Sequence, residues 1–253
     1  MIKGRTITAL LVMTLVLGLA LPAVAAPPQE NPGKGPPELE QIVFIHYLDD
    51  SHPANPNNPL KPDKPGRPGK EEEDPTLYYE LLNLKLPEDV TVYIEGVSEE
   101  DPEIAAILTS FSTWEVETGS VLFDTIHTTT GDMFGIMLND YNTVSFGDLD
   151  NPNIIGVTSL WSFRGKPPRT IVEWDIVLNT DFTWDTDGNP DDMDIQNIAT
   201  HEVGHVVGLA DLYADDYLEQ TMYGYSHDGE TKKRDLLAGD ILGAQSLYGS
   251  PQP

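Results

Sequence analysis

Apolar residues recur at helical spacing in three stretches of the chain after residue 100. The first stretch is framed by residues that typically begin and end helices: Asp101 offers an N-cap carboxylate, Pro102 suits the first helical position and Gly119 suits a left-handed end. Between them the apolar positions are Ile104, Ile107, Leu108, Phe111 and Trp114. This pattern predicts a helix between Asp101 and Gly119, and similar patterns predict helices over about 194–209 and 235–248.

Short runs rich in β-branched and aromatic residues predict strands between and before these helices. Glycine, asparagine, aspartate or proline bounds each run. The predicted strands cover residues 90–94, 121–123, 134–138, 143–146, 155–161 and 171–179. One sheet with a few long helices predicts a single domain of α+β or α/β layout over residues 76–250.

The first residues have the pattern of a secretory signal peptide. Lys3 and Arg5 precede an apolar run over residues 7–21, which is short for a membrane span, and the small residues Ala23 and Ala25 suit a cleavage site. We therefore expect residues 1–25 to be a signal peptide and the protein to be secreted to the extracellular space. An uncleaved membrane anchor is the alternative. No later segment is apolar enough to cross a membrane, so we expect no stable membrane insertion after cleavage.

Residues 26–75 are rich in proline, asparagine, glycine and charge, as in the run Pro53-Ala54-Asn55-Pro56-Asn57-Asn58-Pro59. Such a composition buries too little apolar surface to offset its ordering entropy, so it predicts a linker or a propeptide. One apolar, strand-like run over residues 40–47 interrupts it. This run either pairs with the folded domain or belongs to a prosegment.

The overall charge and the absence of cysteine exclude several classes of function. Forty-two acidic residues against fourteen basic ones give the 253-residue chain a formal net charge of −28. Such a field repels nucleic acid, so we expect no nucleic-acid partner. Without cysteine there is no disulfide, no thiol nucleophile and no thiolate metal site. We expect a soluble monomer.

The most informative stretch is His201-Glu202-Val203-Gly204-His205, followed by Gly208 and Asp211. Histidines four residues apart on a helix lie on one face, where both imidazoles reach a single ion. Glu202 lies beside them, where it contacts a metal-bound water. A glycine at 208 ends the helix with positive φ and turns Asp211 back to the ion. The stretch predicts a zinc site with ligands His201, His205 and Asp211 and with Glu202 as general base and then acid.

This stretch resembles the extended zinc signature of the metzincin peptidases, HExxHxxGxxH/D. Thr221-Met222-Tyr223 is similar to their methionine turn, residues 240–249 resemble the closing helix of the matrixin branch, and residues 173–179 are similar to the strand before the active-site helix. The resemblance implies a metzincin or zincin-like α+β fold, with a twisted mixed sheet, an active-site helix and a small C-terminal subdomain. It also implies a zinc metalloendopeptidase that acts on protein or peptide substrates, with residues 155–161 as the edge strand that accepts them.

The sequence departs from the matrixin pattern at two points. Matrixins usually supply a third histidine, whereas Asp211 resembles the third ligand of snapalysin-like metzincins. The thiol switch of matrixin zymogens cannot operate without cysteine, so inhibition by residues 26–75 would be steric or would use another ligand such as His46 or Asp49. Neither Tyr223 nor Tyr225 has the spacing of a switching tyrosine, and we expect both to serve in packing.

A run of aspartates before the predicted active-site helix leaves a calcium site open as a second possibility. The run extends from Asp181 to Asp194 and includes Gly188, but it lacks the closing glutamate of an EF-hand loop. Asp192 or Asp194 could equally cap the helix. The alternative to a peptidase is therefore a secreted, non-catalytic zinc- or calcium-binding protein of the cell surface. His127 and His227 are isolated in the sequence, and we expect them to be surface or packing residues.

Overall fold

The computed structural model of the chain describes residues 38–49 and 74–251. The predicted signal peptide 1–25 and most of the predicted linker or propeptide 26–75 therefore lie outside the described residues. The described residues belong to one compact unit. None of the helices in these two ranges is both long and apolar enough to cross a membrane.

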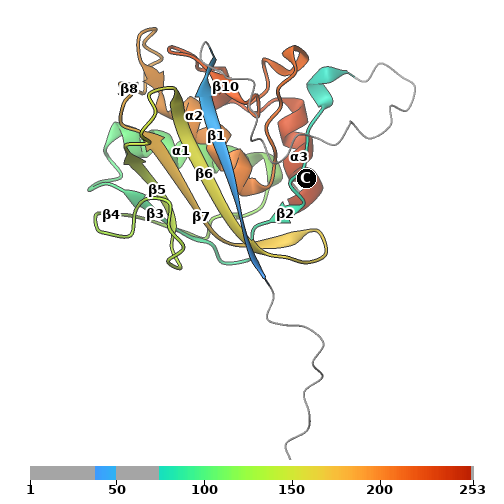
Figure 1. Cartoon of the computed structure of the whole chain (residues 1–253). Coiled ribbons are helices and arrows are strands. Elements are labelled where there is room, and N and C mark those ends of the chain that lie inside the picture. Colours follow the sequence, from blue (N-terminus) through green and yellow to red (C-terminus); the bar gives the residue numbers. More distant parts are fainter. Residues whose placement is uncertain (1–37, 50–73, 252–253) are drawn as a thin grey trace, which may run out of the picture. The chain divides into compact units, whose positions relative to one another are not determined.

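The described residues form a mixed sheet with three α-helices (Figure 1). The helices are α1 (Pro102–Thr118), α2 (Ile195–Val207) and α3 (Ala238–Tyr248). The strands of the large sheet are β1 (Leu39–Leu48), β2 (Leu84–Lys85), β3 (Thr91–Glu95), β4 (Thr125–Thr129), β5 (Asn142–Gly147), β6 (Ile154–Phe163), β7 (Arg169–Asn179) and β10 (Tyr225–Ser226). A separate pair is formed by β8 (Trp184–Asp185) and β9 (Met193–Asp194), and three short 3-10 helices are η2 (Pro75–Leu77), η3 (Asp215–Tyr217) and η4 (Lys232–Arg234).

The strands of the large sheet follow the order β10-β1-β6-β7-β5-β3-β4, with β2 paired to β7. The β4, β3, β5 and β7 strands are parallel to one another, whereas β6 is antiparallel to β7 and β1 is antiparallel to β6. The apolar run predicted at residues 40–47 is thus a strand of the sheet, and it lies between β6 and β10. The predicted α+β class and mixed sheet are confirmed.

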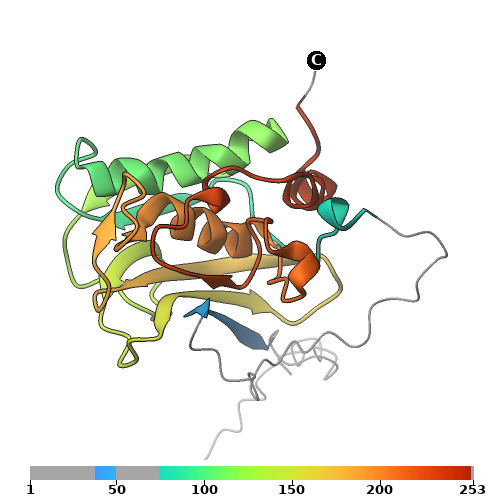
Figure 2. The ribbon, with the colours of Figure 1, turned by 90° about the horizontal axis from the view of Figure 1, so that it is seen from above.

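Helix α2 lies between the sheet and α1, as Figure 2 shows. The inner face of α1 supplies Phe111 and Trp114, which are fully buried, and the indole Nε1 of Trp114 donates to the carbonyl of Thr200 on α2 at 2.9 Å. Because α2 is covered on both sides, all its residues except Gln196 are buried. Helix α2 is therefore held in the core of the domain, and each of its polar groups needs a partner inside the protein.

The helix ends follow the predicted caps. The carboxylate of Asp101 accepts the backbone N–H of Glu103, and Gly119 ends α1 in the left-handed region with φ 63°. At α2 the carboxylate of Asp194 accepts the N–H of Asn197. The third helix begins at Ala238, three residues later than predicted.

Two predicted strands are wrong, and side-chain carboxylates explain both. At residues 121–123, Glu115 Oε1 accepts the N–H groups of Leu122 and Phe123 at 2.8 and 3.0 Å, so this segment is a loop. At residues 134–138 the chain is also a loop, and Asp175 Oδ2 accepts the N–H of Met137 at 3.0 Å. A carboxylate thus replaces the neighbouring strand as acceptor in each place. Strand β4, which was not predicted, pairs with β3 instead.

The segment after α2 forms the small C-terminal subdomain that the fold class implied. It contains η3, β10, η4 and α3. The buried carboxylate of Asp240 on α3 accepts the N–H groups of Thr221, Met222 and Leu237 at 3.0, 3.3 and 3.1 Å. One side chain therefore fastens the turn at 221–222 to α3.

Asp175 gives a prediction for the pH dependence of folding. Burial raises its pKa to about 7, although hydrogen bonds from Thr143 and Met137 oppose this shift. The folded state then keeps a proton that the unfolded state has lost between pH about 4 and 7, so this contribution to stability is present at low pH and lost as the pH rises through 7. Asp175→Asn cannot ionise, and its free energy of unfolding should rise relative to wild type by about 2 kcal/mol between pH 5 and 8.

Urea unfolding at both pH values measures this difference. Asp124→Asn, at an exposed aspartate, is the matched control and should show no such change. A difference between Asp175→Asn and wild type that stays constant with pH would contradict the prediction.

Candidate metal centre and cleft

Three predicted ligand residues converge beside the C-terminal end of α2. Asp211 Oδ1 lies 3.1 Å from His201 Nε2 and 3.3 Å from His205 Nε2. The two histidines are buried, and only 8% of the Asp211 side chain is exposed. Among the described residues, His201, His205 and Asp211 form one of two groups close enough to hold a metal ion, and the other is His46, His201 and Glu202.

Gly208 brings Asp211 to the histidines. Its φ of 113° lies in the left-handed region, which favours glycine, and its N–H closes the helix onto the carbonyls of Gly204 and His205. A Cβ at this position would lie 2.6 Å from the carbonyl oxygen of Leu84. Both the turn and the close approach of the neighbouring backbone therefore require glycine here.

Backbone carbonyls fix the protons of both imidazoles. His201 Nδ1 lies 2.7 Å from the carbonyl oxygen of Thr221, and His205 Nδ1 lies 2.9 Å from that of Leu209. Because a carbonyl only accepts hydrogen bonds, each Nδ1 carries a hydrogen and each ring turns its Nε2 towards Asp211.

This arrangement brings two ring nitrogens and one carboxylate oxygen together at a single point. His201 Nε2 and Asp211 Oδ1 are buried and have no hydrogen-bond partner. Buried polar atoms rarely stay unsatisfied, and a cation would satisfy both of these together with His205 Nε2. Two neutral imidazoles and one carboxylate are a donor set that suits zinc and that leaves a coordination position open.

The ionisation states suit this donor set at His201 and Asp211, whereas His205 favours its protonated form when no metal is bound. Burial lowers the pKa of His205, but the carboxylate of Asp211 outweighs burial and raises this pKa above its usual value. A bound cation would take the place of that proton. Burial lowers the pKa of His201 to about 4, so this ring is neutral at pH 7. Burial opposes the ionisation of Asp211, but the neighbouring histidines overcome it and hold the pKa of this carboxyl well below its usual range. The hydroxyl of Tyr213 donates to Asp211 Oδ2 at 2.9 Å and orients the carboxylate.

Glu202 lies next to this group on α2. Its Oε2 accepts a hydrogen bond from Thr158 Oγ1 on β6 at 2.5 Å, and its Oε1 lies 3.2 Å from His46 Nδ1 on β1. Burial raises the pKa of this carboxyl to about 7. A buried carboxyl with a pKa near neutrality is suited to accept and release a proton at pH 7.

Met222 packs against α2 on the side of Gly204. A Cβ at Gly204 would lie 2.2 Å from Met222 Sδ and 2.8 Å from Trp114 Cζ2, so only glycine leaves room for both side chains. The adjacent Thr221 supplies the carbonyl that holds His201. The turn at 221–222 thus supports the helix and fixes one of its histidines.

Strand β1 lies across the predicted site. It pairs with β6 from Leu39↔Phe163 to Tyr47↔Ile154, and its last residues pair in parallel with β10. The ring of Phe44 stacks on His205 with centroids 4.0 Å apart, and the ring of His46 lies 4.0 Å from His201. The expectation that residues 155–161 form an edge strand is therefore wrong for this structure, because the chain's own β1 covers that edge of β6 (Figure 1).

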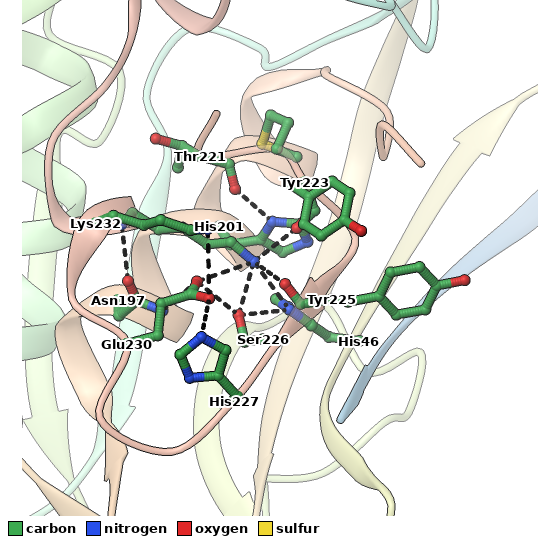
Figure 3. A network of polar contacts seen from close by, with 12 residues as sticks. His46, Asn197, His201, Thr221, Tyr223, Tyr225, Ser226, His227, Glu230 and Lys232 are labelled. Atoms are coloured by element: carbon green, nitrogen blue, oxygen red, sulfur yellow. Dashed lines mark hydrogen bonds and ion pairs between the residues drawn. The ribbon is translucent and has the colours of Figure 1, made fainter. Parts of the chain in front are cut away.

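A buried lysine, which sequence reasoning missed, lies beneath β1 beside His46. Lys233 has no exposed side-chain surface, and its Nζ donates to the carbonyls of Tyr223 and Tyr225 and to Ser226 Oγ at 2.6, 2.7 and 2.7 Å. Figure 3 shows His46, Ser226 and Glu230 in the same polar network. In the sequence Lys233 stands in the basic run Lys232-Lys233-Arg234, which resembles an ordinary exposed segment. Thr158 and Tyr213 also gave no signal in the sequence.

The remaining candidate residues lie outside the metal-capable groups of the described residues. The rings of Tyr223 and Tyr225 pack against each other with centroids 5.7 Å apart. His127 stacks on Tyr93, and His227 is exposed.

Some aspartates of the predicted calcium loop have partners within the protein, although Asp185 Oδ1 is buried without one. Asp185 Oδ2 accepts the N–H groups of Asp187 and Asn189, and Asp194 caps α2 and pairs with Arg234. No metal-capable group of the described residues falls in this loop. Calcium binding stays a prediction, whereas helix capping accounts for Asp194.

The comparisons with known proteins agree with the site. A model of the matrixin family matches residues 88–249. Stromelysin-3 of Homo sapiens is 35% identical over 86 residues, which cover 34% of this chain and 16% of that protein. Stromelysin-3 of Mus musculus is 35% identical over 85 residues, with the same two coverages. The chain therefore spans only a small part of the length of these curated relatives.

The match to the family model covers more than half of the chain and includes α2, the glycine turn and the turn at 221–222. Its strands and helices form the mixed α+β fold that the zinc signature implied. The chain belongs to the matrixin family.

Proposed function

We propose that the protein is a secreted, zinc-dependent endopeptidase in which His201, His205 and Asp211 bind the metal and Glu202 transfers protons. The observation that carries this proposal is the convergence of two buried imidazole nitrogens and a carboxylate oxygen next to a second buried carboxylate. Family membership supports the same reading. The pattern of residues 1–25 supports secretion.

The side chains divide the chemical work between them. When bound, zinc lowers the pKa of a coordinated water and polarises the substrate carbonyl. Glu202 takes a proton from the attacking water as the new C–O bond forms, and delivers it to the amide nitrogen as the C–N bond breaks. The hydroxyl of Thr158 holds one oxygen of Glu202, so the other is free to face the reacting atoms.

An extended peptide is the substrate that the cleft fits. Strand β1 supplies the support, because it lies antiparallel along β6 and passes directly over His205 and Glu202. A substrate in the same place would gain backbone hydrogen bonds from β6 and would present alternate side chains to the cleft. Unfolded protein segments and peptides meet this requirement.

The segment that contains β1 is proposed to be an inhibitory propeptide. Its strand covers the outer edge of β6, Phe44 covers His205, and His46 Nδ1 lies 3.2 Å from Glu202 Oε1. This inhibition is steric and needs no thiol, which suits a chain without cysteine. Asp49 belongs to neither metal-capable group of the described residues.

The alternative of a non-catalytic zinc- or calcium-binding protein is not favoured. A site that had lost catalysis would have no need of Glu202, whose buried carboxylate is costly to maintain.

Zinc binding is the first test. Purified protein should contain about one zinc per chain, and chelation should lower its melting temperature by about 10 °C, because a bound metal stabilises only the folded state. His205→Ala and Asp211→Ala should each weaken zinc binding by more than about 100-fold. Mass spectrometry and competition with a chelating dye measure both effects. His127→Ala is the matched control, and stoichiometric zinc in His205→Ala would contradict the ligand assignment.

Displacement of β1 tests the propeptide. N–H groups of alternate residues in a strand face the same neighbour, so one of the variants Phe44→Pro and Ile45→Pro must remove a hydrogen bond between β1 and β6. That variant should cleave unfolded casein at least about tenfold faster than wild type, as a loss of about 1.4 kcal/mol in strand binding implies. Val43→Thr, on the exposed side of the strand, is the control. Faster amide exchange in β1 with unchanged cleavage would argue against inhibition.

Glu202→Gln tests the proton-transfer role in the same displaced background. This variant keeps the shape of the side chain but cannot accept a proton, so casein cleavage should fall by about 10²–10⁴-fold while zinc content stays at wild-type level. Retained cleavage with retained zinc would rule out Glu202 as the base.

A further inference from the structure

The side chain of His46 fills a pocket beside the catalytic residues. The pocket lies between α2, which supplies His201 and Asn197, and the segment that contains β10 and η4. Its inner end is formed by Ser226, Glu230 and Lys233, all of which are buried. Figure 3 shows His46 directed at Ser226 within this network. A side chain that enters the pocket has to be compatible with the buried ammonium group of Lys233 at its inner end.

The hydrogen bonds of Lys233 are already assigned within the protein. Its three donors meet the carbonyls of Tyr223 and Tyr225 and the hydroxyl of Ser226, and its charge faces Glu230 Oε1 at 3.6 Å. Ser226 Oγ accepts from Lys233, so its own hydrogen points elsewhere. It can reach His46 Nε2 at 3.1 Å or Glu230 Oε1 at 3.2 Å.

His46 shows what the pocket end requires. With Nδ1 donating to Glu202, the neutral ring presents a lone pair at Nε2, which accepts from the Ser226 hydroxyl. The ammonium of Lys233 lies 3.3 Å from the same atom and also favours an acceptor. The inner end of the pocket is therefore a donor surface.

The position of β1 places this pocket next to the bond that would be cut. Phe44 and His46 point to the same face of the strand, towards His205 and Glu202 respectively, and Ile45 points away. The backbone around Ile45 thus passes over the catalytic group. In a substrate that follows the same path, the residue that enters the pocket adjoins the scissile bond.

We infer that Lys233 and Ser226 make this pocket selective for a substrate residue whose neutral side chain ends in a hydrogen-bond acceptor, as histidine, asparagine and glutamine do. The inference rests on the proposed peptidase function. It deepens that function by naming the residues that set its specificity and the class of side chain that they accept.

Other side chains fit the pocket less well for distinct reasons. An apolar side chain would lose the hydrogen bond that Ser226 makes to His46 Nε2 and would place no lone pair beside the ammonium of Lys233. A basic side chain would face Lys233 directly. An acidic side chain would lie beside Glu202 and near Glu230, which already balances the charge of Lys233.

Exchange of the pocket residue in β1 tests this selectivity without catalysis. In the full chain, His46→Leu should speed amide hydrogen exchange of β1 by about tenfold or more, whereas His46→Gln should change it less. In a Lys233→Met background the order should reverse, with leucine held better than histidine. If His46→Leu has the same effect in both backgrounds, Lys233 does not select the side chain.

Lys233 also binds the carbonyls of residues 223 and 225, so Lys233→Met removes structural contacts as well. A second variant background controls for this loss. Ser226→Ala keeps the lysine and removes only the hydroxyl. It should reduce the preference for His46 over leucine by about threefold or more. An unchanged preference would remove the proposed role of the hydroxyl.

The cleavage pattern of the full chain tests the substrate class directly, with β1 displaced by whichever of Phe44→Pro and Ile45→Pro removes the hydrogen bond to β6. Mass spectrometry of digested, unfolded casein should show histidine, asparagine or glutamine enriched several-fold at one position next to the cut, and Lys233→Met should shift that position towards apolar residues. Absence of any cleavage would contradict the peptidase itself. Cleavage without preference at this position would contradict only the pocket.

Discussion

Two hydrogen bonds from imidazole Nδ1 to backbone carbonyls determine what the centre of this molecule can do. The carbonyls of Thr221 and Leu209 hold Nδ1 of His201 and of His205, so that Nε2 of each ring faces Asp211. Residues that position these two carbonyls therefore also position the two imidazole rings. Gly208 turns the chain after α2 and sets Leu209, whereas Asp240 holds the turn that contains Thr221. The glycine turn and the C-terminal helix thus have one purpose, which is to orient two rings that are buried with no solvent to adjust them.

The acidic residues of this chain also have a structural role within the fold. The chain has only fourteen basic residues for forty-two acidic ones, and many carboxylates of the described residues form no ion pair with lysine or arginine. Several of them accept backbone N–H groups instead. Glu173 holds the N–H groups of Asn139 and Asp140, Glu115 holds those of Leu122 and Phe123, and Asp240 holds three more. Carboxylates thus serve as acceptors for loops that a sheet would otherwise have to satisfy.

The sequence predicts those features that depend on local spacing. The caps of α1 and α2 and the approach of His201, His205 and Asp211 follow from offsets within a helix and one turn, so they were accessible without the structure. The loops at residues 121–123 and 134–138 could not be predicted in this way. The carboxylates that accept N–H groups in and next to residues 134–138 come from β7, more than thirty residues away. Lys233 was missed for a similar reason, since its partners are mainly backbone atoms that carry no side-chain signal. The strand character of residues 40–47 was visible, but its neighbour in the sheet was not.

Strand β1 and the residues that it covers belong to one chain, joined through residues 50–73. In the proposed inhibition, its competition with a substrate is therefore intramolecular, and dilution does not weaken it. A tether of this kind corresponds to an effective concentration on the order of millimolar, so even a weakly bound strand keeps the cleft filled against scarce substrates. One cut anywhere between β1 and η2 changes this situation without altering a contact. The strand then becomes a free peptide, which dissociates at ordinary protein concentrations. In the proposed inhibition, covalent connection therefore acts together with contact strength in keeping the cleft closed.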